Sequence, residues 1–523
     1  MAYLSCFLLK NVDKFIKKSL TYSLICDNIR LYNFVVQRRK IMPIPQEILN
    51  VKRPKNTIVI VYGKNKDRYA VRQRIGCRYD NGRNLPINGP IIGHIVDGKY
   101  IPKESKESTI SAVSNTTPQI KDWANVVCCD NVFKDVIDEL TAVYNPKDVF
   151  KLYCIAILRV CYPGIKDYEL KERYEDSFLS ELYPDVALSK NTVSKFLSDL
   201  GKAYSRIVSF MQNRVSELEK NHNIVVDGTL KTNNSRVNSL SDFSRKSRVK
   251  GNKEISVIYA YDLEKMEPIC SKCYSGNMLD LTAYQDFLKE NKIKKGVIVA
   301  DKGFPSSAAC EYFAENPELT YLNPIKRNSK YVQTHNLYEH NELLEGYDAI
   351  TFRKEKCVGA NKWLYSFRDC YKAMLEEKDW LERCNKKKSY SLEEHNRKKK
   401  SFGTIILESG LDLPAKKIYD IYKRRWEIEI VMKYYKSTCG FDETRVHSDY
   451  SVIGSEFCDF LSSILTCKLI NRFDESNLLD ERPYKKIMND LKRAQKIKLQ
   501  DKTWTLRQLT KGNMDILEKL GLL

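Results

Sequence analysis

Short apolar runs that alternate with longer helical patterns dominate the middle of the chain. The run NIVVDGT (223–229) is rich in β-branched residues and ends in an acid, which is typical of a buried strand that delivers a side chain at its carboxyl end. Two further strands are predicted in EISVIYAYDL and EPICSKCYSG, with a hairpin turn at 264–267. A helix in LDLTAYQDFLKENK and an apolar strand in GVIVADKG follow. This order predicts an α/β fold with a mixed sheet, in which adjacent first and fourth strands would bring Asp227 and Asp301 together.

The flanking segments have different patterns. Between about 56 and 102, short β-rich runs alternate with Gly and Asn turns, and a Ser/Thr-rich stretch then has the composition of a linker. Residues 120–220 are dominated by helical spacing, and Ser189 or Asn191 is placed to cap a helix that ends at Gly201. Two interpretations stay open for these helices, a helix-turn-helix DNA-binding region and a subdomain packed only against the core.

A chain of 523 residues is too long for one ordinary hydrophobic core, so several domains are expected. The predicted parts are a leader foreign to the rest at 1–41, with Met42 as an alternative start; a small β-containing module and linker at 42–118; a helical DNA-binding region at 119–220; the first part of the core at 221–320; a β-rich insertion at 321–400; the second part of the core, with a long helix, at 401–475; and a C-terminal helical region at 476–523.

Charge and cysteine usage narrow the class of protein. Lys and Arg (88) exceed Asp and Glu (67) by 21 while aromatic content stays at 11%, which indicates a folded basic protein with a polyanionic partner. Charge alone does not separate DNA from RNA or an anionic membrane. The 16 cysteines lack the regular spacing of a disulfide framework, which favours reduced thiols and an intracellular protein. Cys270 and Cys273 form one CxxC with no second pair, so a core role is favoured over a zinc site. No apolar run reaches the roughly 18 residues that span a bilayer.

One helical segment, IYDIYKRRWEIEIVMKYYKST, carries an unusual stripe. Tyr422, Arg425, Glu429 and Lys436 are separated by three, four and seven residues, which places them within a sector of about 60°. Three acids from two strand ends and this helix would supply oxygen ligands for two divalent ions about 3.5–4 Å apart, as phosphoryl transfer requires. Each acid alone is weak evidence, because an aspartate at a strand end is often only a turn or cap residue.

The spacing Tyr422-x2-Arg425-x3-Glu429-x6-Lys436 resembles the YREK signature of insertion-sequence DDE transposases. DGT at Asp227 and ADKGF at Asp301 resemble the first and second acid motifs of that family. SGNMLD, YLNPIKRNS and LPAKKIYDIYKRRWEIE extend the resemblance over residues 223–471. It implies a ribonuclease H-like catalytic core with a β-rich insertion before the catalytic helix, acting on terminal inverted repeats.

The resemblance also implies roles for these residues. Asp227, Asp301 and Glu429 become the ligands of two Mg²⁺ or Mn²⁺ ions, while Tyr422, Arg425 and Lys436 hold the DNA backbone near the cut end. Arginine and lysine bind phosphate directly, which agrees with that role. The implied partners are double-stranded DNA, as terminal repeat and target, and a second copy of the chain. A cytoplasmic, DNA-associated protein with no membrane contact is expected.

Further DNA-binding candidates come from charge runs and from tryptophan. The basic candidates are Arg245, Lys246, Arg248, Lys250 and the run that ends at Lys400; solvated surface is the alternative for each. In the family that the chain resembles, a tryptophan of the insertion can stack on a flipped base. Trp363 is the candidate and Trp380 its rival, with packing under the insertion sheet as the alternative for both. Trp426 lies about 100° off the stripe and is interpreted as a core residue.

Two other functions stay open from the sequence. One is a captured transposase that only binds DNA, which would be expected to have lost an acid or a YREK position, although none is lost here. The other is a ribonuclease H-like nuclease that cleaves DNA without joining it.

Overall fold

The computed structural model describes residues 44–62, 68–80, 83–103, 119–233, 235–245, 247, 251–278, 280–301, 304–357, 360–433, 440–499 and 501–523. For residues 78–80, 83–85, 280, 281 and 426–433 it describes the backbone alone. The chain divides into two compact units, Met1–Thr117 and Pro118–Leu523. The predicted leader at 1–41 and four of the predicted DNA-binding residues lie outside the described residues: Lys246, Arg248, Lys250 and Lys436.

The described part of the first unit is a small antiparallel sheet with one short helix, α2 (Gln46–Leu49). Its strands are β1 (Thr57–Tyr62), β2 (Arg68–Asp80), β3 (Arg83–Val96) and β4 (Lys99–Pro102), in the order β1-β2-β3-β4. Val59, Val71 and Ile95 form its buried core. The β-rich pattern in the sequence therefore corresponds to a real sheet.

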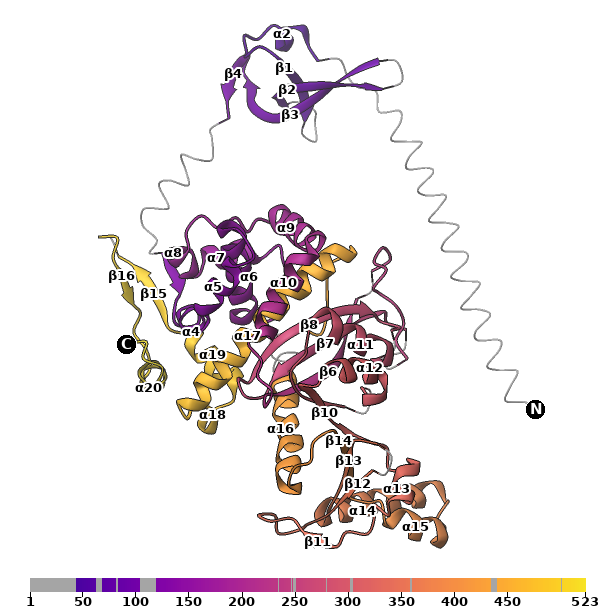
Figure 1. Cartoon of the computed structure of the whole chain (residues 1–523). Coiled ribbons are helices and arrows are strands. Elements are labelled where there is room, and N and C mark those ends of the chain that lie inside the picture. Colours follow the sequence, from indigo (N-terminus) through magenta and orange to yellow (C-terminus); the bar gives the residue numbers. More distant parts are fainter. Residues whose placement is uncertain are drawn as a thin grey trace, which may run out of the picture. The chain divides into compact units, whose positions relative to one another are not determined.

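The second unit is built on a mixed sheet, and the five strands at one end of this sheet are ordered β8-β7-β6-β9-β10 (Figure 1). These strands are β6 (Asn223–Thr232), β7 (Glu254–Asp262), β8 (Glu267–Ser275), β9 (Gly296–Ala300) and β10 (Leu319–Pro324). β6, β7 and β8 run antiparallel, whereas β9 runs parallel to β6 and β10 parallel to β9. This is the ribonuclease H-like arrangement, and the predicted adjacency of the first and fourth strands is confirmed. Between β8 and β9 the chain forms α11 (Asp280–Glu290), as the sequence predicts.

The insertion continues this sheet. β14 (Thr404–Ser409) pairs with β10, and β13 (Trp363–Asp369), β12 (Ile350–Lys356) and β11 (Glu342–Leu343) follow in antiparallel order. Three helices accompany these strands, α13 (Lys330–Thr334), α14 (Cys370–Lys387) and α15 (Leu392–Lys399), so the insertion is more helical than its sequence suggests. The expected boundary at 321 is also corrected, because it falls inside β10, which pairs with β9 as a core strand.

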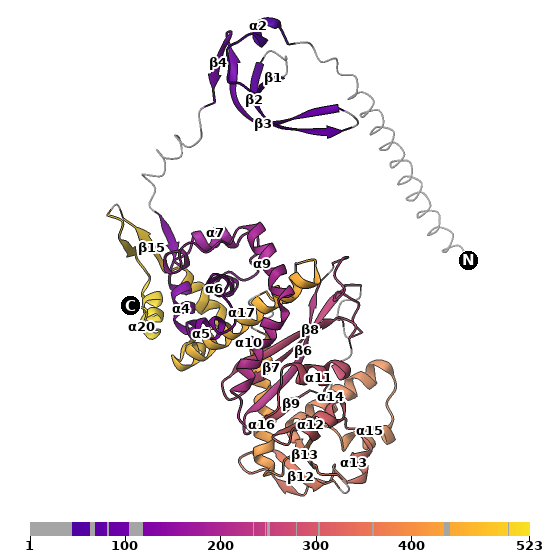
Figure 2. The same cartoon turned by 45° about the horizontal axis from the view of Figure 1, so that its top comes forward.

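In the described part of the second unit, seven helices precede β6: α4 (Ala124–Phe133), α5 (Asp135–Thr141), α6 (Pro146–Cys161), α7 (Leu170–Glu175), α8 (Leu179–Leu182), α9 (Lys190–Lys202) and α10 (Tyr204–Ser216). Ser189 caps α9, because its side chain accepts a hydrogen bond from the amide of Thr192. The 27-residue helix α17 (Asp449–Glu475) packs against α9, α6, α4 and β8, and so joins the helical region to the sheet (Figure 2).

The approach of α9 to α17 depends on glycine. A Cβ atom added to Gly201 would lie 1.9 Å from the carbonyl oxygen of Tyr450, and one added to Gly454 would lie 2.1 Å from that of Leu197. The two backbones therefore touch at positions where no other residue fits.

The C-terminal region contains strands as well as the expected helices α18 (Leu478–Glu481), α19 (Tyr484–Lys492) and α20 (Lys511–Lys519). β15 (Gln495–Lys498) pairs with both β16 (Trp504–Leu506) and the early strand β5 (Ile120–Asp122). The C-terminal chain thus completes a small sheet that starts in the helical region. Among the described residues, no helix combines the length and apolar character needed to cross a membrane.

Candidate active site

The first two predicted acids follow a pair of residues in register. Val226 of β6 lies opposite Ala300 of β9, and this is where the pairing of these two parallel strands ends. Neighbouring strands are about 4.8 Å apart, so Asp227 and Asp301, the residues that follow this pair, lie side by side. Asp227 is half-buried and Asp301 is exposed, so the position is open to solvent on the Asp301 side.

The sequence pattern predicts a strand that ends at Asp227, and this prediction is wrong. It is the fifth residue of the ten-residue strand β6, which continues to Thr232. The reason is that β7 stays paired with β6 along its length, with Asp227 opposite Tyr259, whereas β9 stops at Ala300. At Asp227, β6 is thus paired with β7 on one side, whereas its pairing with β9 on the other side has ended.

The face of β6 that carries Asp227 also carries Lys231, since alternate residues of a strand share a face. The Lys231 ammonium is fully buried and lies 2.6 Å from Glu456 Oε2 and 2.8 Å from Asp459 Oδ2, both on α17. On this face Tyr261 is fully buried as well; burial raises the pKa of its hydroxyl, and the Asp227 carboxylate contributes to the rise. α17 therefore covers the sheet face on which the first acid lies.

The third predicted acid is on α16 (Ala415–Lys433), which packs against β6, β12 and β13. Pro414 directly precedes this helix, at an end where proline is well tolerated, and its carbonyl accepts a hydrogen bond from the amide of Ile418. The Arg425 guanidinium lies 5.6 Å from the centre of the Tyr422 ring, so these two stripe residues share a helix face. Tyr422 is buried, with 8% of its surface exposed. Glu429 lies on the same helix, and its side chain, like that of Trp426, is outside the described part.

The segment that follows α16 is bound to the end of β6. The Thr232 amide donates to the carbonyl of Asp442 at 3.0 Å, and the Thr444 amide donates to the carbonyl of Thr232 at 2.9 Å. The buried side chain of Asn233 adds hydrogen bonds to the carbonyls of Thr444 and Val446. The strand that carries the first predicted acid is therefore bound, at its end, to the segment Gly440–Val446.

A buried carboxylate that the sequence did not single out supports the chain after the second acid. Glu408 of β14 is 6% exposed, accepts a hydrogen bond from the Ser306 hydroxyl and pairs with Lys362 at 2.9 Å. Ser306 begins the short helix that follows Asp301, η1 (Ser306–Ala309). No local motif marks Glu408; its role depends on β14 lying next to β10.

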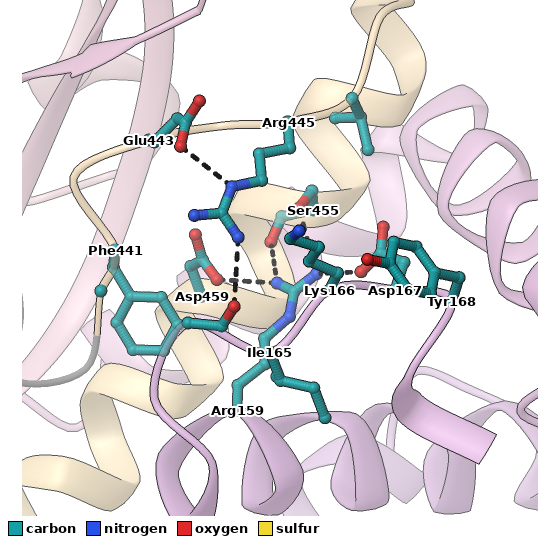
Figure 3. Close-up of a pocket in the computed structure, with 13 residues that line it drawn as sticks. Arg159, Ile165, Lys166, Asp167, Tyr168, Phe441, Glu443, Arg445, Ser455 and Asp459 are labelled. Carbon is teal, nitrogen blue, oxygen red and sulfur yellow. Dashed lines mark hydrogen bonds and ion pairs between the residues drawn. The ribbon is translucent and has the colours of Figure 1, made fainter. Parts of the chain in front are cut away.

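A cavity of about 220 Å³ lies where α6, α17 and the segment Gly440–Val446 meet (Figure 3). The Arg159 guanidinium on its wall pairs with Asp459 at 2.7 Å and with Asp167 at 3.2 Å. Arg445 pairs with Glu443 at 2.9 Å and donates to the carbonyl of Gly164. Since both guanidinium groups are already neutralised, the cavity wall serves to hold the helical region against the core.

The two tryptophan candidates have different surroundings. Trp380 is buried between α14 and α15, with its ring stacked on His395 at 5.1 Å, so it is a packing residue. Trp363 is half-buried at the start of β13, and the ammonium groups of Lys354 and Lys356 lie 4.5 and 5.7 Å from its ring centre. The insertion therefore presents a partly exposed aromatic ring that is flanked by two cations.

Among the basic DNA-binding candidates, Arg245 is exposed.

The cysteine pair has no metal-site geometry. Cys270 and Cys273 lie three apart on β8, and residues at that spacing in a strand point to opposite faces. Among the side chains that the structure describes, no group of three or more His, Cys, Asp or Glu residues is placed to hold a metal ion. The expected trio of Asp227, Asp301 and Glu429 is not among these side chains, because the side chain of Glu429 lies outside the described part.

Residues 222–452 match the family model described as "Transposase DDE domain". This part of the chain is a transposase DDE domain. The match covers both predicted aspartates, the insertion and α16, and transposases with this domain generally use divalent metal ions. No curated protein sequence matches the chain.

Among solved structures, the chain is similar to a piggyBac transposase in a synaptic complex with hairpin DNA, determined by cryo-EM. The two chains are 11% identical, and the match covers 72% of this chain and 82% of the other, with a TM-score of 0.37. At that level the arrangements differ too much for individual residue roles to be carried across.

Proposed function

We propose that this protein is the transposase of an insertion sequence, and that it cuts and joins DNA at the terminal inverted repeats of that element. The observation that carries the proposal is the register of Val226 with Ala300, which places Asp227 and Asp301 side by side at the end of a paired segment. The transposase domain supplies the reaction class. The net charge of +21 suits a protein that must hold a polyanion.

The proposed metal ligands are Asp227, Asp301 and Glu429. Carboxylate oxygens are the ligands that Mg²⁺ and Mn²⁺ prefer, and two carboxylates leaving adjacent strands fit a shared cation. When bound, a pair of such ions activates the attacking oxygen and stabilises the leaving oxygen. The docking of Gly440–Val446 on the end of β6 supports a position of α16 from which Glu429 reaches this pair.

The same helix face is proposed to hold the DNA. Arg425 would bind a phosphate beside the cut end, with Tyr422 holding its guanidinium through the observed stacking rather than by touching DNA itself. Lys436, which follows Glu429 by seven residues in the sequence, would bind the next phosphate. The exposed Arg245 and the neighbouring Lys246, Arg248 and Lys250 would extend this track, as would the helical region around α9.

Trp363 is proposed to stack on an unpaired base near the cut end. The two lysines beside its ring would then contact the flanking phosphates. A 2-aminopurine placed at each position near the transposon end would report this stacking as quenched fluorescence, and quenching that persists in Trp363→Ala would exclude the role. Since two ends must be joined in one event, the active form is proposed to be a dimer on DNA, in the cytoplasm.

The deciding experiment uses the full chain, an end-labelled duplex that carries the flanking terminal repeat, and Mg²⁺. Wild-type protein should release a 3′-hydroxyl at the repeat and join it to a second DNA. Asp227→Asn, Asp301→Asn and Glu429→Gln should each abolish cleavage while end binding persists, whereas Glu311→Gln, which changes an exposed acid of the same unit, should cleave normally.

Three other outcomes separate the alternatives. Cleavage without joining would indicate a nuclease, and binding without cleavage would indicate a captured DNA-binding protein. Cleavage that survives in any one of the three acid variants would remove that residue from the metal site.

A further inference from the structure

The longest feature of the first unit is a two-stranded ribbon. β1 pairs with β2 only as far as Gln73, and β4 pairs with β3 only from Gly93 onward. Between these limits, Arg74–Asp80 and Arg83–Asn88 form strand pairs only with each other, and the Arg74 amide at the base also donates to the carbonyl of Asn56; we call these two segments the ribbon. At about 3.3 Å per residue the ribbon is roughly 20 Å long. Figure 2 shows it as the long hairpin beyond the label of β3.

Breaks in the pairing lie where the ribbon leaves the sheet. The register of β2 against β3 shifts between Val71 and Arg72, between Arg72 and Arg74, and between Arg74 and Gly76. Such bulges bend and twist a pair of strands, so they aim the ribbon away from the small core. The described side chains from Gln73 to Cys77 and from Pro86 to Asn88 are all exposed. The ribbon therefore contributes nothing to the core that would explain its length.

The unit that carries the ribbon is strongly basic. Residues 44–103 contain twelve lysines and arginines but only four acids, so this stretch is far more basic than the chain as a whole. Arg72 and Arg74 stand at the base of the ribbon, and Arg78 and Arg83 follow in its sequence. In the described part of this unit no ion pair is formed, in contrast to the buried pairs of the second unit. The positive charge of the described part of this unit is thus not neutralised by its own acids.

Two large apolar side chains are exposed on the same ribbon, Ile75 at 63% and Ile87 at 42%. An exposed strand pair with apolar side chains invites aggregation unless it has a partner to cover. The major groove of duplex DNA is about 12 Å wide and admits a two-stranded ribbon. There, arginines reach phosphates on both sides, and apolar side chains meet thymine methyl groups.

We propose that the ribbon is a DNA-binding element that enters the groove of a duplex, separate from the residues that bind DNA at the transposase domain. The inference rests on the proposed function for its biological role, because a transposase must hold DNA beyond the bond that it cuts. The occupant is duplex DNA rather than an anionic membrane, since the exposed isoleucines and the arginines beside them belong to a narrow two-stranded ribbon, which fits a groove better than a flat surface.

The test measures binding of the full chain to a fluorescent duplex by anisotropy, at several salt concentrations and without divalent metal. All proteins carry Asp227→Asn, so cleavage plays no part. Arg72→Ala with Arg74→Ala should weaken binding roughly ten- to hundredfold near 0.1 M salt and lower the salt slope by about two. Arg74→Glu should also weaken binding to the duplex. Because it changes a single exposed position, it keeps the test valid if the double variant disturbs the sheet.

The matched control is Lys52→Ala with Lys55→Ala, which removes the same charge from exposed positions of the same unit outside the ribbon. This pair should change the affinity by less than about threefold. Equal losses in both pairs would mean that only diffuse charge matters, and would overturn the inference. So would a ribbon variant that keeps its affinity for DNA but loses binding to phosphatidylserine vesicles. Failure of the proposed function is seen separately, as absence of cleavage by the protein with Asp227 intact.

Discussion

Lys231 donates to Asp459 at 2.8 Å in the interior of the protein, and this contact connects β6, the strand of the first predicted acid, to α17, the longest of the described helices. Burial alone lowers the pKa of Lys231, but the carboxylates of Asp459 and Glu456 outweigh it and hold the pKa above its usual value. Asp459 also pairs with Arg159 of α6. The helical region and the catalytic sheet thus share one charge network, which fixes the strand on which Asp227 lies.

Replacing Lys231 with Met should destabilise the second unit strongly. The variant leaves two carboxylates in the core with less positive charge, and removing one member of a buried ion pair costs about 3–5 kcal/mol. The measurement is urea unfolding at neutral pH. Lys265→Met is the control: it breaks the surface pair with Glu217, whose side chains are 44% and 60% exposed, and should cost less than about 1 kcal/mol. Similar losses in the two variants would contradict the structural role of Lys231.

Gly201→Ala should separate α9 from α17. The added methyl group would collide with the backbone of Tyr450, which does not move as a side-chain end could. Forced repacking of this kind costs about 1–3 kcal/mol or more. Gly512→Ala in α20 is the matched substitution, because nothing lies within 4 Å of its new Cβ atom, and it should be neutral or slightly stabilising. Thermal unfolding of both variants tests this, and an unchanged midpoint for Gly201→Ala would show that the helices can separate freely.

Glu408→Gln should slow DNA cleavage with little effect on DNA affinity. The neutral side chain pairs less well with Lys362 and Ser306, so the chain after Asp301 loses part of its support. Loss of a group that orients a metal ligand typically costs 10- to 100-fold in activity or metal affinity. Single-turnover cleavage over a range of Mg²⁺ concentrations should show a raised metal requirement. If Glu408 has a purely structural role, the variant should instead have a lower unfolding midpoint and an unchanged dependence of cleavage on Mg²⁺. Glu355→Gln, at a half-exposed position of β12, is the control and should cleave normally.

Stability should fall as the pH drops from about 6.5 to 4. Burial, with a smaller effect of Arg368, lowers the pKa of His340 from 6.5 to about 4. In this window the unfolded chain binds a proton that the folded chain does not, so acid favours unfolding. The histidine ring is hydrogen-bonded to Ser366 at 2.9 Å. His340→Gln should flatten the dependence of the urea midpoint on pH between these values, and an identical slope in the two proteins would exclude His340 as its source.

The local sequence determined the elements and the chemistry they carry. Strand periodicity placed β6, β7, β8 and β9, Ser189 and Pro414 marked two helix starts, and the spacing on α16 put Tyr422 and Arg425 on one face. These features depend on interactions within a few residues, which is why they can be predicted without a fold.

Only the tertiary structure decided how the elements share strands and charge. β6 continues past Asp227 because β7 pairs with it, β10 joins the core because β9 lies beside it, and the C-terminal strand β15 exists because β5 offers an edge. Lys231 is no different from a surface lysine in sequence, yet α17 buries it between two acids. Strand pairing and the burial of charge are set by partners far away along the chain, so no local pattern could have specified them.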